Sequence, residues 1–155
     1  MNISKNIIEG LIITPLKQII DERGNVMHML RKDSKVFKKF GEIYFSSTNP
    51  NAVKAWHKHK KATLNYVCIK GQIKFVLYDD RKNSKTKGLI QELFLTPENY
   101  FLVTVPPLIW NGFKGIGTET SIVANCTTVP FSDKEIIRRP ALSDTIPYNW
   151  GLIHK

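Results

Sequence analysis

The stretch Lys54–Gly71, KAWHKHKKATLNYVCIKG, carries the strongest structural signal in the chain. From Leu64 onward it is rich in β-branched and aromatic side chains and ends at Gly71, which is typical of a strand followed by a turn. Ahead of that strand, His57 and His59 lie two residues apart, and residues two apart on a strand point to the same face. We therefore expect both imidazoles on one side of a sheet.

Short β-type segments continue on both sides of this stretch. EIYFSST at 42–48 precedes it and stops at the turn residues of 49–51. IKFVLYDD, IQELFL, YFLVTV and TSIVANCTTV follow, separated by polar or proline-containing turns. Many short strands at close spacing are typical of a β-sandwich or barrel, and 155 residues suit one domain. The sequence therefore predicts a single all-β domain over residues 1–155.

Two segments near the end depart from this pattern. FSDKEIIRR at 131–139 has a helical pattern, with Ser132 in the N-cap position and Glu135 three residues on. PALSDTIPYNW at 140–150 is punctuated by prolines. We expect one short C-terminal helix followed by an extended arm.

The composition narrows the class of protein and of partner. With 42% hydrophobic and 23% charged residues the chain is typical of a globular protein, and no apolar run approaches the roughly 18 residues of a membrane span. Cys68 and Cys126 lie in apolar segments without metal-type spacing, which favours reduced thiols and a cytoplasmic location. The net charge of +10 predicts an anionic partner, but the basic residues accompany no nucleic-acid motif. Neither a nucleic acid nor a membrane is the expected partner; most lysines suit a solvated surface, and the alternative is that some face a phosphorylated small molecule.

The paired histidines and the later turn resemble the two motifs of the cupins. The first cupin motif is HxH, an acid and a glycine, and the second is a proline-led turn that ends in histidine. Here Thr63 stands where the acid belongs, and Asn111, in PPLIWNGF, stands where the third histidine belongs. Two histidines make a poor transition-metal site, which needs three or four protein ligands. The resemblance implies a cupin-type double-stranded β-helix, or jelly roll, and we expect it to hold neither a metal nor another cofactor.

Four motifs narrow the resemblance further. DERG at 21–24, WHKH at 56–59, GQIKFVLYDDR at 71–81 and VPPLIWNGF at 105–113 occur in this order in the dTDP-4-dehydrorhamnose 3,5-epimerase family. The chain resembles that family from about Asp21 to Trp150. The resemblance implies a homodimer that acts on a nucleotide-diphosphate sugar, a nucleotide-linked 4-keto-6-deoxy sugar, in the synthesis of cell-surface polysaccharide such as lipopolysaccharide.

The implied chemistry suits the residues. A ketone at C4 acidifies the hydrogens at C3 and C5, and imidazole is a natural base for them near neutral pH. The resemblance implies that His57 is this catalytic base and that Asp79 orients its ring, as carboxylates orient histidines in other sites. It also implies that Arg23 and Lys54 hold the diphosphate, with Lys54 standing where the family has an arginine.

Four further residues complete the candidate site. His59 is expected to assist His57 in catalysis, and Asn65 shares its face if the strand stays regular through residues 57–69. Tyr44 is expected to stack on the nucleotide base, and Asn111 to hydrogen-bond the ligand or the backbone at the cavity mouth.

Other positions depart from the epimerase pattern. Where the family has a lysine that stabilises the enolate, residues 63–65 read Thr-Leu-Asn, and the family's acidic tyrosine falls at about Ala124. A double epimerase returns a proton to the face opposite the one from which it was removed, so another acid is needed. The sequence does not choose between Tyr44, Tyr100 and Tyr148.

Two alternatives therefore stay open. The segment HKHKK…VCIKG also resembles the dTDP-4-keto-6-deoxyglucose 3,4-ketoisomerases, which carry HAHKK before a strand with a cysteine near its end. That reaction moves a proton along one face of the sugar through an enediol. The substituted positions also suit a catalytically silent cupin that binds a sugar nucleotide or a glycan.

Overall fold

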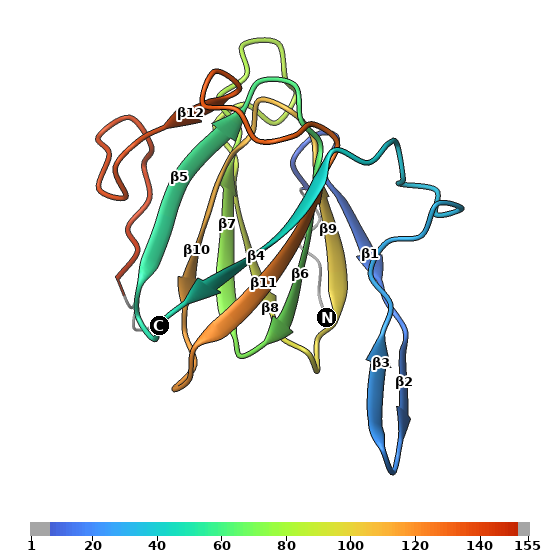
Figure 1. Cartoon of the computed structure of the whole chain (residues 1–155). Helices are drawn as coiled ribbons and strands as arrows, with labels where there is room; N and C mark the ends of the chain where they lie inside the picture. Colours follow the sequence, from blue (N-terminus) through green and yellow to red (C-terminus); the bar gives the residue numbers. More distant parts are fainter. Residues whose placement is uncertain (1–6, 152–155) are drawn as a thin grey trace.

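Residues 7–151, the part of the chain that the computed structural model describes, contain twelve strands and no helix, hence no helix that could cross a membrane. Ten of the strands form two five-stranded sheets that face each other (Figure 1). The first sheet has the order β1 (Ile12–Pro15), β9 (Phe101–Val105), β6 (Leu64–Lys70), β11 (Ser121–Thr127) and β4 (Glu42–Thr48). The second has the order β12 (Ile136–Arg138), β5 (Val53–His59), β10 (Trp110–Gly115), β7 (Ile73–Tyr78) and β8 (Ile90–Leu95).

The order of strands is that of a jelly-roll-like sandwich. All the paired strands are antiparallel, and most neighbours within a sheet are distant in sequence, such as β6 between β9 and β11. The expectation of an all-β fold is therefore confirmed.

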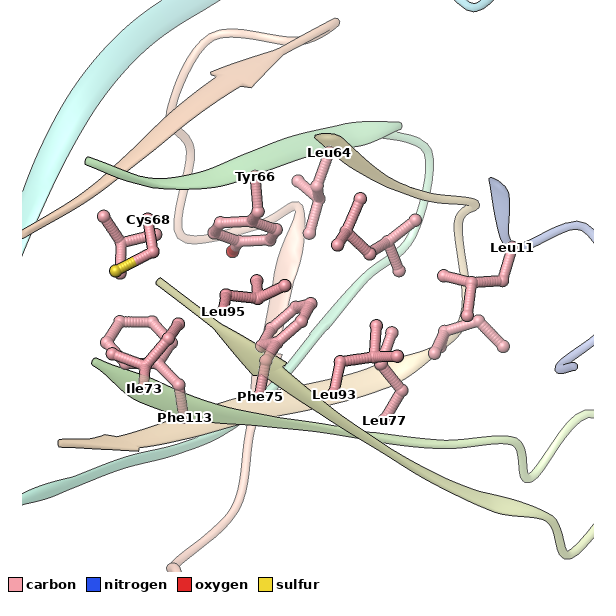
Figure 2. Close-up of a cluster of buried hydrophobic side chains, with 14 of the residues drawn as sticks. Leu11, Leu64, Tyr66, Cys68, Ile73, Phe75, Leu77, Leu93, Leu95 and Phe113 are labelled. Atoms are coloured by element: carbon pink, nitrogen blue, oxygen red, sulfur yellow. The ribbon is translucent and has the colours of Figure 1, made fainter. Parts of the chain in front are cut away.

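The main core lies between the two sheets. Alternate side chains of β6 and β7 point into it, as the two-residue period of a strand requires (Figure 2). Tyr66 of β6 lies against Phe75 of β7, with ring centroids 5.0 Å apart. The exposed fractions of Ile73, Phe75 and Leu77 are all 0%, so this layer is closed to solvent.

A second apolar cluster covers the outer face of the second sheet. The arm of residues 139–150 crosses this face and places Ile146 and Trp150 against Trp56 and Trp110. The Trp56 ring lies 5.0 Å from that of Trp150, and its Nε1 donates to the Ala141 carbonyl at 3.3 Å. Since Trp56 is fully buried on the outer side, the alternation of β5 turns His57 and His59 to the inner side.

The helix expected at residues 131–139 does not form. Ser132 and Glu135 do join in a turn, through a bond from the Glu135 N–H to the Ser132 carbonyl at 2.9 Å. The chain then pairs as β12 with β5, where Ile136 lies opposite His59 and Arg138 opposite His57. Backbone pairing with a sheet and a buried role for the Glu135 side chain replace the local helical preference.

A hairpin stands apart from both sheets. It consists of β2 (Gln18–Asp21) and β3 (Gly24–Met27), and Figure 1 shows it projecting from the sandwich at the end of β1. Ile19, Ile20 and Val26 on it are more than half exposed.

Candidate active site

A cavity of about 560 Å³ lies between the two sheets. One wall comes from β4, β6 and β11 of the first sheet, the other from β5 and β10 of the second, and the segment 129–138 closes the rim. The side chains that line it are Glu42, Tyr44, Ser46, Tyr66 and Thr127 on the first wall, Val53, Lys54, Ala55, His57, His59 and Phe113 on the second, and Val129, Pro130, Phe131, Glu135, Ile136 and Arg138 at the rim.

His57 projects from β5 into this cavity, half-buried. Burial lowers the pKa of His57 below its ordinary value of 6.5, and the electrostatic influence of the nearby Arg138, His59 and Lys54 lowers it further. The imidazole is therefore neutral at pH 7 and has a lone pair to accept a proton.

His59 lines the same cavity and has a carboxylate partner. Its Nδ1 lies 2.6 Å from Glu135 Oε2, and both side chains are about nine-tenths buried. Glu135 Oε1 accepts the backbone N–H groups of Lys61 and Ala62 at 2.7 and 2.9 Å. Burial opposes the ionisation of Glu135, but these hydrogen bonds together with His59 hold its pKa below the usual value. This contact at Nδ1 orients the His59 ring and leaves Nε2 as the nitrogen available to a ligand.

Two cationic side chains flank His57. Arg138 lies opposite it on the neighbouring strand β12 and holds Asp133 at 3.0 Å with a half-exposed guanidinium. Lys54 precedes it on β5, and its Nζ donates to Ser46 on β4 at 2.8 Å. Both can meet negative charge on a ligand in the cavity.

Hydroxyl and amide groups form a network on the opposite wall. Asn125 Nδ2 donates to the Tyr44 hydroxyl at 2.8 Å, and the Tyr66 hydroxyl forms a further hydrogen bond with Tyr44. Burial raises the pKa of Tyr66 well above its ordinary value, and the neighbouring Tyr44 adds to this shift. Tyr66 therefore stays neutral across the working range of pH, and its hydroxyl donates to Asn111 Oδ1 at 3.5 Å.

In the structure, Asn65 and Asn111 lie behind the cavity wall and not in the cavity, where the sequence placed them. The turn after His59 breaks the register expected for a regular strand, so Tyr66 and not Asn65 faces the cavity. Asn65 is buried on the other face, where its side chain donates to the Cys126 carbonyl and accepts from Thr104. Asn111 Nδ2 donates to the His57 carbonyl at 3.1 Å, which is the backbone contact among the two alternatives expected for it.

Asp79 does not meet His57. It is fully buried at the end of β7, outside the cavity lining, and accepts hydrogen bonds from Arg81, Ser84 and Thr86 at 2.6–3.0 Å. Burial raises the pKa of Asp79, but these hydrogen bonds outweigh it and hold the pKa well below the usual range. Through these hydrogen bonds the carboxylate holds the loop between β7 and β8 in place. Its contacts do not support the expected role of orienting His57.

Arg23 also lies away from the cavity of its own chain. It occupies the turn of the hairpin, where its guanidinium pairs with Asp21 and its side chain is 85% exposed. Among the described residues, the lysine and arginine side chains that line the cavity are Lys54 and Arg138, and Arg23 is not one of them.

Tyr66, Asn125, Glu135 and Arg138 belong to the site and were not among the residues expected from the sequence. A signal for Glu135 was present, because it stands in a capping-box pattern, but that pattern predicts a local helix rather than a bond to His59. The positions of the others depend on strand pairing. Among residues 7–151, no three His, Cys, Asp or Glu side chains gather as a metal site requires, and the metal-free expectation stays a prediction.

The chain matches a known family and several known proteins over most of its length. The model of the dTDP-4-dehydrorhamnose 3,5-epimerase family matches residues 5–150. The chain is 33% identical over 123 residues to the probable low-salt glycan biosynthesis epimerase Agl13 of Haloferax volcanii, covering 78% of this chain and 79% of that protein. It is 28% identical over 146 residues to the spore coat polysaccharide biosynthesis protein SpsL of Bacillus subtilis, covering 93% and 97%. The crystal structure of a dTDP sugar isomerase from Desulfovibrio desulfuricans G20 superposes with a TM-score of 0.90 at 43% identity, covering 92% of each chain.

The substitution Asp79→Asn tests whether Asp79 has a structural role or a catalytic one. We expect Asp79→Asn to lower the free energy of unfolding by about 1–3 kcal/mol, since the loop donors lose a buried charged acceptor, and to leave turnover at saturating substrate unchanged. Because the native carboxyl has a depressed pKa, the stability gap to wild type is full at pH 7 and shrinks as the pH falls below about 4.

Denaturant unfolding at several pH values, beside turnover, checks this. Asp33→Asn, which changes an exposed carboxylate paired with Arg31, is the matched control and should leave stability nearly unchanged. A catalytic role for Asp79 is supported instead if turnover falls by orders of magnitude with no change in stability.

Proposed function

The chain belongs to the dTDP-4-dehydrorhamnose 3,5-epimerase family, and we propose that it inverts a carbon next to the ketone of a nucleotide-linked 4-keto-6-deoxy sugar. The family comprises isomerases of nucleotide-linked sugars. The observation that carries the proposal is the placement of a neutral, half-buried imidazole, His57, in a sugar-sized cavity between two cationic side chains. The similarity to a glycan epimerase and to a spore coat polysaccharide protein supports a place in the synthesis of cell-surface polysaccharide.

Each neighbour of His57 fits a part of this reaction. His57 removes the proton next to the ketone, and its lowered pKa keeps it in the basic form at neutral pH. The negative charge that appears on the ketone oxygen is stabilised by Arg138, whose guanidinium lies beside His57. Lys54 faces the diphosphate, as expected from its match to the family's arginine.

We propose further that the protein acts as a homodimer in the cytoplasm. The projecting hairpin carries exposed apolar side chains, and so does the edge strand β4, with Ile43 49% and Phe45 64% exposed. A second copy that covers these surfaces also accounts for the exposed position of Arg23, because the hairpin then places this residue at the cavity of the other copy. The two cysteines, Cys68 and Cys126, are both buried and free, which suits a reducing compartment.

The 3,4-ketoisomerase reaction is a second candidate, favoured by the pair of His59 and Glu135. This pair places a second, oriented imidazole in the same cavity as His57, where it can assist a base that moves a proton along one sugar face. Incubation with a 4-keto-6-deoxy sugar nucleotide in deuterated water separates the candidates. Epimerisation labels C3 or C5, ketoisomerisation moves the ketone to C3 and places the new hydrogen on C4, and a silent binding protein labels none of these carbons.

The role of His57 predicts the behaviour of His57→Asn. Loss of a general base typically costs about 100- to 10,000-fold in rate, so deuterium entry into the keto sugar should fall by that factor. Substrate affinity should change little, since the cationic groups that meet the diphosphate stay in place. The measurement is solvent exchange followed by NMR or mass spectrometry, together with equilibrium binding.

His28→Asn is the matched control, because His28 is exposed and lies outside the cavity lining, and it should exchange at the wild-type rate. If His57→Asn exchanged deuterium as fast as wild type, His57 would not be the base, and His59 would be the next candidate.

The shared site predicts complementation between two defective variants. Arg23→Ala should bind the substrate weakly in homodimers, and His57→Asn should be inactive. In heterodimers one cavity has both residues intact, so mixing and re-forming the dimers at equal concentrations should restore about a quarter of wild-type activity.

Activity at low substrate concentration, measured before and after mixing, tests this. Arg31→Ala removes an exposed arginine with the same type of aspartate partner as Arg23 and should bind substrate as wild type does. If mixing restores no activity although heterodimers form, each chain's site is complete on its own and Arg23 is not shared.

A further inference from the structure

The proposed inversion requires a proton donor that the groups assigned above do not supply. His57 removes a proton from one face of the sugar, and the new hydrogen must arrive on the opposite face. His57, His59, Lys54 and Arg138 all enter the cavity from the second sheet or from its edge strand β12. The donor is therefore to be sought on the wall formed by the first sheet. This inference rests on the proposed function and names a further residue for it.

Among the described residues, five polar side chains line that wall, and three do not suit the role. The Thr127 hydroxyl already donates to the Val129 carbonyl at 2.6 Å. Ser46 receives the hydrogen bond of Lys54 and, as an aliphatic alcohol, is a far weaker acid than a phenol. Glu42 is the first residue of β4 and stands two residues farther than Tyr44 from the contact between Ser46 and Lys54 in the cavity. Tyr44 and Tyr66 are left.

The network around Tyr44 leaves its proton available. Asn125 donates from Nδ2 to the Tyr44 oxygen at 2.8 Å, and the orientation of this amide is fixed because Asn125 Oδ1 accepts the Asn65 N–H at 3.1 Å. Tyr66 is buried and neutral, and its hydroxyl also bonds to Tyr44. Because Asn125 donates to its oxygen, Tyr44 has its own O–H to share with Tyr66 or with a ligand.

The same neighbours stabilise the Tyr44 phenolate that remains after the proton has been donated. A phenolate at Tyr44 keeps the Asn125 amide as a hydrogen-bond donor, and the adjacent Tyr66 hydroxyl can turn from Asn111 to donate to it as well. Charge-assisted hydrogen bonds are stronger than neutral ones. Tyr44 is also 36% exposed, so solvent can return the proton.

The other tyrosines considered from the sequence are excluded by position. Tyr100 packs with Ala124 and Val67 in a cluster on the outer face of the first sheet. Tyr148 lies in the C-terminal arm, where its hydroxyl bonds to Glu92. Asn125, next to Ala124, is the residue of this part of β11 that faces Tyr44.

We propose that Tyr44 is the proton donor of the inversion, and that Tyr66 and Asn125 are its positioning residues. His57 takes the proton from the carbon next to the ketone, and the C–H electron pair forms the enolate double bond as the ketone oxygen gains the negative charge. The enolate then takes the proton of Tyr44 on the opposite face; the O–H bond breaks, its electrons stay on the phenolate, and a C–H bond forms. Water protonates the phenolate and accepts the proton from His57, which restores both groups.

The test is Tyr44→Phe in the full-length protein, with dTDP-4-keto-6-deoxyglucose in deuterated water. Two rates are followed: deuterium entry with the original configuration retained, and formation of the inverted product. We expect inversion to fall by about 100-fold or more while retained exchange through His57 persists and KM is nearly unchanged. A second variant, Tyr66→Phe, keeps the buried ring and should lower inversion by about 10- to 100-fold, also with little change in KM.

Tyr148→Phe is the matched control, since it removes a phenol outside the cavity and should invert the sugar as wild type does. The inference is overturned if Tyr44→Phe inverts the sugar at the wild-type kcat, with or without a raised KM, because Tyr44 is then only a binding contact. Wild-type protein that incorporates no deuterium at any carbon overturns the proposed function itself. The two failures are thereby distinguished.

Discussion

The alternation of side chains along β5 is the constraint on which the site depends. Trp56 is fully buried beneath the C-terminal arm, and Lys58, two residues on, binds Asp80 at 2.8 Å and lies over the Trp110 ring. Both contacts lie on the outer face of the second sheet, so the period of two residues directs His57 and His59 inward. A slip of one residue would turn both imidazoles away from the cavity. The aromatic cluster under the arm therefore determines that the two histidines face the cavity, although none of the aromatic residues lines it.

Glu135 connects this strand to the rest of the site. Its carboxylate holds His59 with one oxygen and the backbone N–H groups of Lys61 and Ala62 with the other, which fixes the turn between the two sheets. The pairing of β12 with β5 sets Arg138 beside His57 at the same time. One short segment thus supplies the orientation of one histidine and the positive charge beside the other.

The sequence predicted the parts of the site that follow from local periodicity. The β-rich pattern and the common face of His57 and His59 required only the two-residue period of a strand. Asn65 was placed wrongly because that period was carried through a turn, and the helix at residues 131–139 was wrong because pairing with β5 outweighs the capping pattern of Ser132 and Glu135. Tyr44 could be named as a site residue, but its hydrogen bond with Asn125 depends on the register of β4 with β11, which the sequence does not contain.

The proposed base and the proposed acid lie on opposite sheets, and the fate of a label in a single turnover tests their roles directly. Substrate deuterated at C3 and C5 is mixed with excess protein in ordinary water, and the inverted product is analysed by mass spectrometry and NMR. If His57 takes the deuteron on one face and Tyr44 gives a proton on the other, the inverted carbon carries hydrogen and no deuterium. Deuterium retained at the inverted carbon would show that one group both removes and returns the same proton, and would contradict the account.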